Sequence, residues 1–344
     1  MNRVDDPTGT RQAPVAGTVA TVCGPVPPEN LGVTNAHDHL FLTSAALPGI
    51  ELEDEGAALA EAKAFTAAGG SCLVQWSPAG TGRRLDALER ISVAAGVHVV
   101  AATGRHLAAH YQPSSPVRSM GVDGLANLFV EDLTRRGCGL IKVGTEYWGP
   151  GEFDRMSLEA AANAAGSTGV PIAVHLERGT AALEVLDALE RHGHPASRVI
   201  LGHLGRFPDR TYITQVLQRG CYACFDAPSM NNHATDWRTP SLIAELCSDG
   251  YADLLMVGAD TTNAKAQPAS GGAPGTSNLL RWTASHLQPL LGIRNMHKML
   301  VENPARALTV LHREVVNGRG SEDLRAGCGL PHSHPDHGGP HDSR

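Results

Sequence analysis

The sequence predicts a single (β/α)8 barrel on three observations. The chain has 344 residues, a length that suits either two average domains or one large α/β barrel. Eight short runs of apolar and β-branched residues alternate with stretches rich in Ala, Leu and Glu. Such runs are typical of strands buried on both faces of a parallel sheet. Because nothing resembles a second domain, eight repeats favour a closed barrel over an open, doubly wound sheet.

The predicted elements follow one another in regular order. We expect strands at residues 33–40, 72–76, 97–103, 140–145, 171–176, 199–204, 221–226 and 254–260. Helices are expected at 55–68, 84–95, 125–136, 158–168, 181–191, 212–218 and 242–247, with 279–291 and 303–313 after the last strand. The glycine-containing segment 80–84 fits neither common nucleotide-binding pattern, so it does not support the doubly wound alternative.

Both ends of the chain are expected to lie outside the barrel. We assign residues 1–20 to a flexible N-terminal segment, 21–316 to the barrel and 317–344 to a disordered tail. The tail is rich in Gly, Pro and His and has few large apolar groups. Its histidines could chelate a metal weakly, although a solvated tail is the favoured interpretation: His332, His334, His337 and His341.

Composition narrows the class of protein. The 28 basic and 35 acidic residues give a net charge of −7, which argues against nucleic acid or an anionic membrane surface as the main partner. No apolar run approaches the roughly 20 residues that span a bilayer. The first residues lack the apolar stretch of a signal peptide, so we expect a cytoplasmic protein with a small-molecule substrate. Seven scattered cysteines indicate reduced thiols, and Cys221 and Cys224 would face opposite sides of a strand.

Ionisable residues close several of the predicted strands. In a barrel of this kind, the carboxyl ends of the strands share one mouth, where active sites are found. His37 and His39 lie two apart, so they share a face and can bind one ion together. An H-x-H pair alone is weak evidence, and two polar residues in a turn are the structural alternative. The pattern extends, however, to the ends of four further strands: Lys142, His175, His203 and Asp260.

Lys142 is the most informative of these residues. It is one of four lysines in the chain and lies inside the apolar run 140–143. A buried ammonium group is costly, so it is expected to lose its proton or to find a partner. Beside two cations it can instead react with carbon dioxide, giving an anionic carbamate that bridges the ions. The structural alternative is a lysine that reaches solvent from the end of its strand.

Several segments, in the same order, resemble the phosphotriesterase family of the amidohydrolase superfamily. They are HDHL at 37–40, where the family usually has HEHL, AGGSCLVQWSPAGTGR at 68–83, IKVGT at 141–145, VHLERGTAALEVLDAL at 174–189, VILGHL at 199–204, GAD at 258–260 and NPAR at 303–306. The resemblance spans nearly the whole barrel. It implies a metal-dependent hydrolase with two divalent ions, most often zinc, and imidazole and carboxylate ligands suit that metal.

The resemblance also implies a role for each ligand. His37, His39 and Asp260 would bind the more buried ion, and His175 and His203 the more exposed one. Relatives of this kind are commonly dimers, so a homodimer is compatible with the resemblance.

Carboxylated Lys142 and a hydroxide would bridge the two ions. Two cations lower the pKa of a shared water, which supplies a hydroxide nucleophile near neutral pH. The more exposed ion would polarise the substrate and stabilise the developing oxyanion. Asp260 would take the proton from the attacking hydroxide and deliver it to the leaving group, so Lys142 and Asp260 are the expected catalytic residues.

Three further segments resemble the sugar-lactonase branch of the family. They are TGRHLAAHY at 103–111, LGHLGRFPD at 201–209 and GGAPGTSNLLR at 271–281. This likeness implies hydrolysis of a five- or six-membered lactone or a related ester. Positions where phosphosugar lactonases carry basic residues are Met230 and Asn263 here, with Lys265 the only nearby cation. Because a phosphate dianion needs such groups, we predict an unphosphorylated substrate.

Three other positions depart from the pattern. Gly205 stands where relatives often have an aspartate that relays protons, and Arg105 and His106 occupy a loop where many relatives have an aromatic residue. The side chains expected to contact substrate lie in loops after the strands: His106, His110, Tyr111, Tyr147, Trp148, Arg178, Asn231 and Asn263.

The same set of expected ligands and catalytic residues is compatible with other functions. Superfamily members also cleave amides, lactams and phosphoesters, and fold does not choose among these. A biosynthetic enzyme that uses the pocket for condensation is a further alternative. A non-catalytic binding relative would be expected to have lost ligands, whereas all six positions are filled here.

Overall fold

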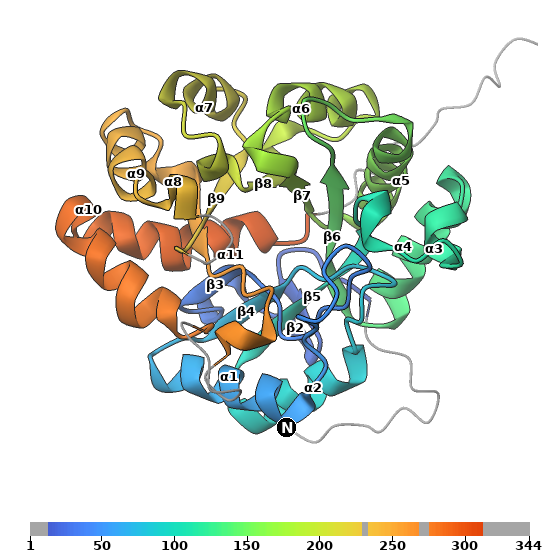
Figure 1. Ribbon diagram of the computed structural model, residues 1–344, viewed down its shortest axis with the longest axis horizontal. Helices are drawn as coiled ribbons and strands as arrows, with labels where there is room; N and C mark the ends of the chain where they lie inside the picture. Colours follow the sequence, from blue (N-terminus) through green and yellow to red (C-terminus); the bar gives the residue numbers. More distant parts are fainter. Residues whose placement is uncertain (1–12, 229–232, 268–274, 312–344) are drawn as a thin grey trace, which may run out of the picture. The chain divides into compact units, whose positions relative to one another are not determined.

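Eight parallel strands form a barrel surrounded by helices, as the sequence predicts (Figure 1). The computed structural model describes residues 13–228, 233–267 and 275–311, all within one compact unit, residues 1–313. Adjacent strands pair in sequence order: β3 (Thr34–Asp38), β4 (Cys72–Gln75), β5 (His98–Arg105), β6 (Cys138–Thr145), β7 (Ile172–Leu176), β8 (Val199–Gly202), β9 (Tyr222–Asp226) and β10 (Leu255–Gly258). Each coincides with one of the eight predicted strands.

The barrel closes where β10 meets β3. The backbone N–H of Asp260 donates to the carbonyl oxygen of His37 at 2.9 Å, and that of Ala259 donates to Asn35 Oδ1 at 3.0 Å. At Gly258, an added Cβ would lie 2.5 Å from the Cβ of His37, so the approach of the two strands requires glycine. Closure therefore places Asp260 beside His37.

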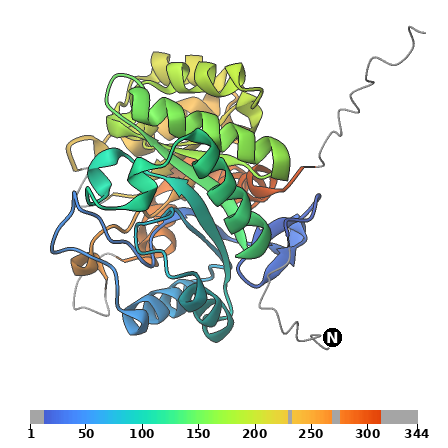
Figure 2. The ribbon, with the colours of Figure 1, turned by 90° about the vertical axis from the view of Figure 1, so that its right-hand side faces the viewer.

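Helices cover the outside of the barrel (Figure 2). They are α1 (Glu55–Ala67), α2 (Leu85–Ala95), α3 (Pro116–Ser119), α4 (Val122–Arg135), α5 (Glu152–Thr168), α6 (Ala182–Arg191), α7 (Arg210–Leu217), α8 (His233–Asp236), α9 (Thr239–Ser248), α10 (Ser285–His297) and α11 (Asn303–Leu308). Their boundaries follow local rules: Asp54 caps α1 by accepting from the N–H of Ala57, and Gly96 ends α2 in the left-handed conformation.

Two C-terminal helices differ from the prediction. The expected helix 303–313 ends at Leu308, because the next residues pair with the N-terminal segment instead: Val310 N–H donates to Thr18 O, and Gly17 N–H donates to Val310 O, both at 2.8 Å. The expected helix 279–291 begins as a π-helical stretch (Leu279–Ala284) and continues through α10 to His297, with a non-helical backbone at Gly292.

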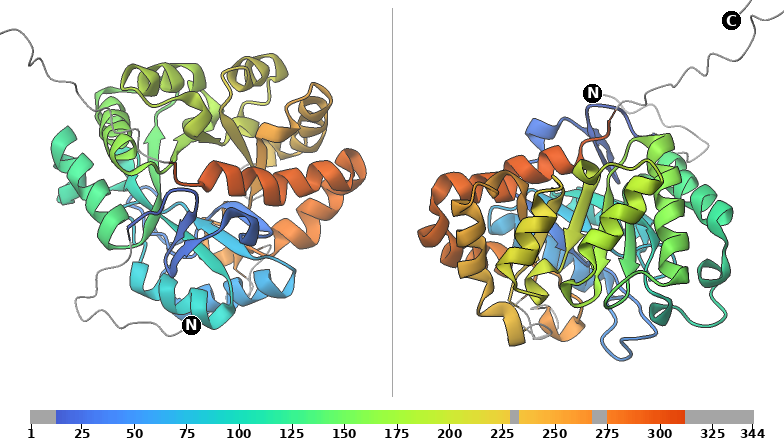
Figure 3. Two further views of the ribbon diagram at one scale, coloured as in Figure 1. Left: turned by 180° about the vertical axis from the view of Figure 1, so that it is seen from behind. Right: turned by 90° about the horizontal axis from the view of Figure 1, so that it is seen from above.

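The end of the barrel opposite the carboxyl ends of the strands is covered by segments from both ends of the chain (Figure 3). A hairpin of β1 (Val19–Thr21) and β2 (Gly24–Val26) lies there, so the first strand begins before residue 21, where the barrel was expected to start. Val19 and Leu308 are buried and pack with residues that fill the barrel interior, among them Leu140 and Ile200. Residues 1–12 and the predicted tail lie outside the described residues.

The described helices include none that is both long and apolar enough to cross a membrane.

Candidate metal centre

One cavity of about 570 Å³ lies at the carboxyl ends of the strands. Its lining combines strand-end residues with loop residues from around the mouth. The structure brings together all six predicted ligands along this lining: His37, His39, Lys142, His175, His203 and Asp260.

His37, His39 and Asp260 form the deeper group. Asp260 Oδ1 lies 3.4 Å from the Nε2 atoms of both histidines, and all three side chains are buried. His37 stacks on Trp76 with ring centroids 3.9 Å apart, and His39 Nδ1 lies 2.8 Å from Ser77 Oγ. These contacts fix the rings so that both Nε2 atoms face Asp260. Three donor atoms therefore converge as a chelating group.

His175 and His203 form the second group. His203 Nε2 lies 2.8 Å from His175 Nδ1, while His175 Nε2 lies 3.0 Å from Glu177 Oε2. The His175 side chain is 12% exposed and that of His203 is 1% exposed. Burial, followed by the charge of Arg206, lowers the pKa of His203 to about 4, against the opposing effect of Asp226. Both rings are thus neutral near pH 7 and can offer a lone pair to a cation.

Lys142 lies within the barrel between these groups. Lys142 is 1% exposed. Among the described residues, its side-chain nitrogen has no hydrogen-bond partner and no ion pair within 4 Å. Burial lowers the pKa of Lys142 well below its usual range, and the nearby Asp260 only partly opposes this effect. Burial therefore favours the neutral amine, which is the form that reacts with carbon dioxide.

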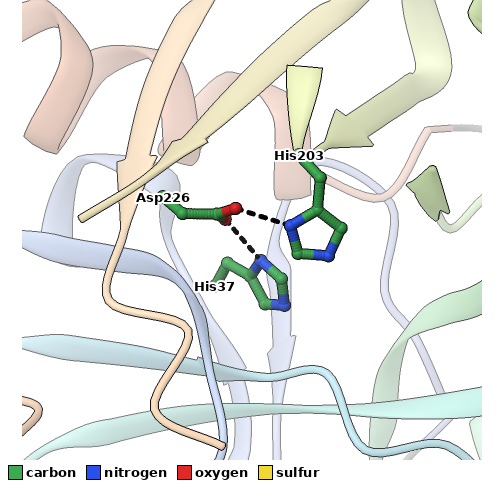
Figure 4. A group of neighbouring side chains, drawn as sticks. All are labelled: His37, His203 and Asp226. Carbon is green, nitrogen blue, oxygen red and sulfur yellow. Dashed lines mark hydrogen bonds and ion pairs between the residues drawn. The ribbon is translucent and has the colours of Figure 1, made fainter. Parts of the chain in front are cut away.

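Asp226 is a functional residue that the sequence analysis missed. Its carboxylate lies between two of the predicted ligands (Figure 4): Oδ2 is 2.5 Å from His203 Nδ1, and Oδ1 is 3.4 Å from His37 Nδ1. Although these three residues could in principle chelate an ion, Asp226 does not line the cavity. We therefore interpret Asp226 as an anchor whose Oδ2 accepts from His203 Nδ1–H and whose Oδ1 faces His37 Nδ1 at 3.4 Å, so that both Nε2 atoms are left for the cavity.

The electrostatics of Asp226 agree with this interpretation. Burial alone would raise its pKa, but the interactions of the carboxylate with His203, Arg206 and His37 lower it below the ordinary value. A signal for this residue existed in the sequence, because Asp226 ends the seventh predicted strand just as Asp260 ends the eighth.

Arg206 is a second missed residue. It lines the cavity, its Nη2 lies 2.7 Å from Asp260 Oδ2, and its Nε lies 3.4 Å from Asp226 Oδ2. The neighbouring Gly205 packs tightly: an added Cβ would lie 3.2 Å from Phe225 and 3.3 Å from Thr239 Oγ1. An aspartate at this position would need its neighbours to move, so the cation of Arg206, and not a carboxylate, accompanies Asp260 here.

Three of the predicted substrate contacts line the cavity, namely His106, His110 and Tyr147. The rings of His106 and His110 stack with centroids 3.8 Å apart. His106 Nδ1 accepts from the backbone N–H of Leu107 at 2.8 Å, so the neutral ring carries its proton on Nε2. Burial lowers the pKa of His110 to about 4. The pair thus offers neutral imidazole groups to a substrate.

Four other predicted contacts are placed elsewhere. Tyr111 is buried, and its hydroxyl accepts from the backbone N–H of His106 at 2.7 Å. Arg178 is exposed, while the Asn263 side chain accepts from the backbone N–H of Lys265 at 2.9 Å. None of these three lines the cavity, and Trp148 lines a neighbouring groove instead. These four residues thus lie outside the lining of the cavity that holds the expected ligands, and their contact with substrate stays a prediction.

Asn231 and Met230 lie outside the described residues, so the structure does not place these two positions.

A barrel whose strand ends bring imidazoles, an amine and a carboxylate into one cavity is typical of a class of metal-dependent hydrolases. Residues 17–308 match the model of the phosphotriesterase family, and the chain belongs to this family. It is a hydrolase, as the resemblance predicted.

Named relatives show the range of the family. A phospho-furanose lactonase of Mycoplasmopsis agalactiae is 31% identical over 251 residues, which cover 66% of this chain and 70% of the relative. An N-acetyltaurine hydrolase of Salmo salar is 25% identical over 86% of this chain and 99% of the relative. The crystal structure of an amidohydrolase from Mycoplasma synoviae superposes with a TM-score of 0.80 at 26% identity, covering 86% of this chain and 93% of that one.

Proposed function

We propose that this protein is a binuclear metal-dependent hydrolase that opens a small, unphosphorylated lactone or a related carboxylic ester. The observation that carries the proposal is the convergence of six side chains from five strands and their ends into one cavity. Zinc is the expected metal, and carboxylated Lys142 is the expected bridging ligand. A homodimer and a cytoplasmic location are compatible with this proposal.

The donor set fits two cations of this kind. Imidazole nitrogens and a carboxylate are ligands that zinc prefers, and no cysteine lines the cavity. His37 and His39 lie 3.4 Å from Asp260, beyond a good hydrogen bond, although these polar atoms are buried. Buried polar groups are normally paired, so a cation among them supplies the missing partner.

The chain's own residues then have separate tasks. The bound metals would lower the pKa of a shared water, with a bridging hydroxide as the nucleophile, and would polarise the substrate carbonyl. Asp260 accepts the proton of the attacking group at its carboxylate and passes it to the leaving alkoxide. Arg206 holds Asp260 Oδ2 in place, and Asp226 holds the rings of His37 and His203. His106 offers its Nε2–H to an oxygen of the substrate.

The charge of the cavity supports an unphosphorylated substrate. Glu146 and Glu177 line it in addition to Asp260, whereas its basic residues are Arg206 and buried Lys142. Arg206 already contacts the carboxylates of Asp226 and Asp260. A phosphate dianion would have to lose its water with little cationic replacement. The proposal therefore departs from the phosphorylated substrate that the name of the Mycoplasmopsis agalactiae relative indicates.

Amide hydrolysis is the second candidate, because one relative is named N-acetyltaurine hydrolase and the same cavity can polarise an amide carbonyl. Phosphoester cleavage, a biosynthetic reaction and a non-catalytic binding role are the remaining alternatives.

A substrate panel tests the proposal. Zinc-loaded protein is mixed with unphosphorylated lactones, phosphorylated lactones, cyclic amides and aryl phosphotriesters, and acid release is followed with a pH indicator. We expect hydrolysis of the unphosphorylated lactones, its loss on chelation and its return when zinc is added. Hydrolysis of the amides alone would establish the second candidate, and preference for phosphorylated lactones would contradict the substrate assignment.

Asp260→Asn gives a matched test of the site. This variant should retain much of the metal but lose most turnover, because the amide cannot accept the proton. Asp249→Asn is the control, since Asp249 forms a surface ion pair with Arg210 and neither residue lines the cavity. Unchanged turnover in Asp260→Asn would contradict the role of Asp260.

A further inference from the structure

Trp148 is an exposed aromatic residue with an unfavourable backbone conformation. Its side chain is 66% exposed, although it is a large apolar group, and its backbone has φ 70°, in the left-handed region that a bulky residue rarely adopts. Such strain persists where function requires it. Two of the other non-glycine residues with positive φ are the predicted ligands His203 and Asp260. Trp148 therefore shares its unusual backbone with residues of the catalytic cavity.

Specific contacts hold the turn that carries this indole. The backbone N–H of Trp148 donates to Thr180 Oγ1 at 3.0 Å, and that hydroxyl in turn donates to Glu177 O at 3.1 Å. The indole lies edge-on to Phe207, with centroids 6.5 Å apart, and beside Tyr147, with centroids 4.9 Å apart. The ring is thus held in a defined place while much of it remains open to solvent.

Trp148 lines a groove of about 750 Å³ between the beginning of α5 and the exposed side of α6. The polar residues of the groove carry both signs of charge: Arg155, Glu184, Asp187, Glu190 and Arg191.

The charges of the groove are largely balanced. Asp187 and Glu190 form ion pairs with Arg219. Within the described ranges, Arg155 and Glu184 make no side-chain hydrogen bond or ion pair, so their polar groups can turn to a ligand. With three carboxylates and two guanidinium groups, the groove has no strong field of one sign. It therefore suits an uncharged ligand with many hydrogen-bonding groups better than it suits an anion.

We propose that this groove is an outer subsite that binds an uncharged sugar ring attached to the lactone. A pyranose has an apolar face that can stack on an indole, and its hydroxyls can pair with Arg155 and Glu184. Tyr147 lines the catalytic cavity and Trp148 lines the groove, so one turn borders both. A lactone in the cavity can extend a glycosyl substituent past Tyr147 onto Trp148. This inference rests on the proposed lactonase function and names its substrate class as a glycosylated aldonolactone.

Two lactones that differ by one sugar test this inference. Glucono-1,5-lactone has no glycosyl group, whereas cellobiono-1,5-lactone carries a glucosyl ring. With the zinc-loaded protein, we expect kcat/KM to be at least about tenfold higher for the disaccharide lactone, mainly through KM. Trp148→Ala should lower the ratio of the two kcat/KM values about tenfold, and Trp148→Phe should restore part of it. Trp237→Ala is the matched control, because Trp237 is 77% exposed and lines neither the groove nor the cavity.

Binding of cellobiose, measured by calorimetry, gives a readout that needs no turnover. Cellobiose binding that is lost in Trp148→Ala and kept in Trp237→Ala supports the subsite, even if neither lactone is hydrolysed. Failure to hydrolyse either lactone would overturn only the proposed function. If both lactones are hydrolysed with equal kcat/KM and Trp148→Ala leaves their ratio unchanged, the subsite is overturned and the lactonase function stands. Absence of cellobiose binding to the wild-type protein also overturns the subsite.

Discussion

Arg206 and Asp260 are joined by a direct contact: the guanidinium Nη2 lies 2.7 Å from Asp260 Oδ2. The other carboxylate oxygen of Asp260, Oδ1, faces the Nε2 atoms of His37 and His39. The two oxygens therefore have different neighbours. Rotation of the carboxylate would break both the contact with Arg206 and the contacts with the two histidines. A cation on one side and imidazoles on the other fix the group that is proposed to transfer the proton.

Replacing Arg206 by Gln should lower kcat about 10–100-fold, because a hydrogen bond to a charged group contributes about 1.5–3 kcal/mol. The metal content should change little, since Arg206 is not among the expected ligands, and Arg206→Lys should recover part of the activity. Steady-state kinetics and metal analysis of the same samples provide the measurement. Arg210→Gln, which removes a surface ion pair, is the control. A normal kcat in Arg206→Gln would show that Asp260 needs no such support.

Asp226→Asn should weaken metal binding about 10–100-fold, a typical effect of removing the partner of a metal-binding histidine. An amide has a single acceptor oxygen, so it cannot place an acceptor at both His203 Nδ1 and His37 Nδ1 as the two carboxylate oxygens do. Competition with a chelator of known affinity measures the change, and Asp249→Asn controls for loss of a negative charge. Equal zinc affinity in Asp226→Asn and the wild type would refute the anchoring role.

Lys142→Met should separate metal binding from fold stability. Methionine fills similar space without a buried amine, so the free energy of unfolding of the metal-free protein should stay equal or rise. Zinc content should fall, because the bridging ligand is lost. Unfolding in urea and metal analysis measure the two effects, with exposed Lys63→Met as the control.

Wild-type protein prepared with ¹³C-labelled bicarbonate should also show a carbamate signal by ¹³C NMR that Lys142→Met lacks. Full zinc occupancy in the variant would count against Lys142 as a ligand.

His194 should make stability depend on pH in a region remote from the cavity. Burial lowers its pKa to about 4, and its Nε2–H donates to Arg198 O at 3.3 Å. Between pH 6.5 and 4 the unfolded chain binds this proton and the folded chain does not, so the contribution is lost as the pH falls. The loss is at most about 3 kcal/mol.

Unfolding in urea at pH 7 and at pH 4.5 tests this contribution. Relative to the wild type, His194→Gln should be less destabilised at pH 4.5 than at pH 7, because glutamine has no proton to gain. A constant difference between the two proteins at both pH values would contradict the assignment.

The eight strands could be predicted from the sequence because each is an apolar run bounded by polar loops. The hairpin β1–β2 could not, since its strands have three residues each and one includes Pro25. The end of the last helix at Leu308 depends on long-range pairing of Val310 with Thr18, which no local pattern reports. Elements with a local signal were therefore found, and those defined by tertiary contacts were not.

The candidate site shows the same division. The six expected ligands could be located because each lies at or just after a predicted strand end. Arg206 could not, because its role depends on the left-handed backbone of His203, which directs the following turn across the cavity. The sequence could not place the Tyr111 side chain, because an aromatic residue in a loop can point outward to substrate or inward; here its hydroxyl accepts from the backbone N–H of His106.

The end of the barrel opposite the cavity is filled by three buried aliphatic residues, Val19, Leu31 and Leu308, and this has a consequence for turnover. With that end filled by aliphatic side chains, no second exit exists through the centre of the described barrel. Substrate must then enter, and product leave, through the same opening at the carboxyl ends of the strands, so slow release of a product would delay binding of the next substrate molecule.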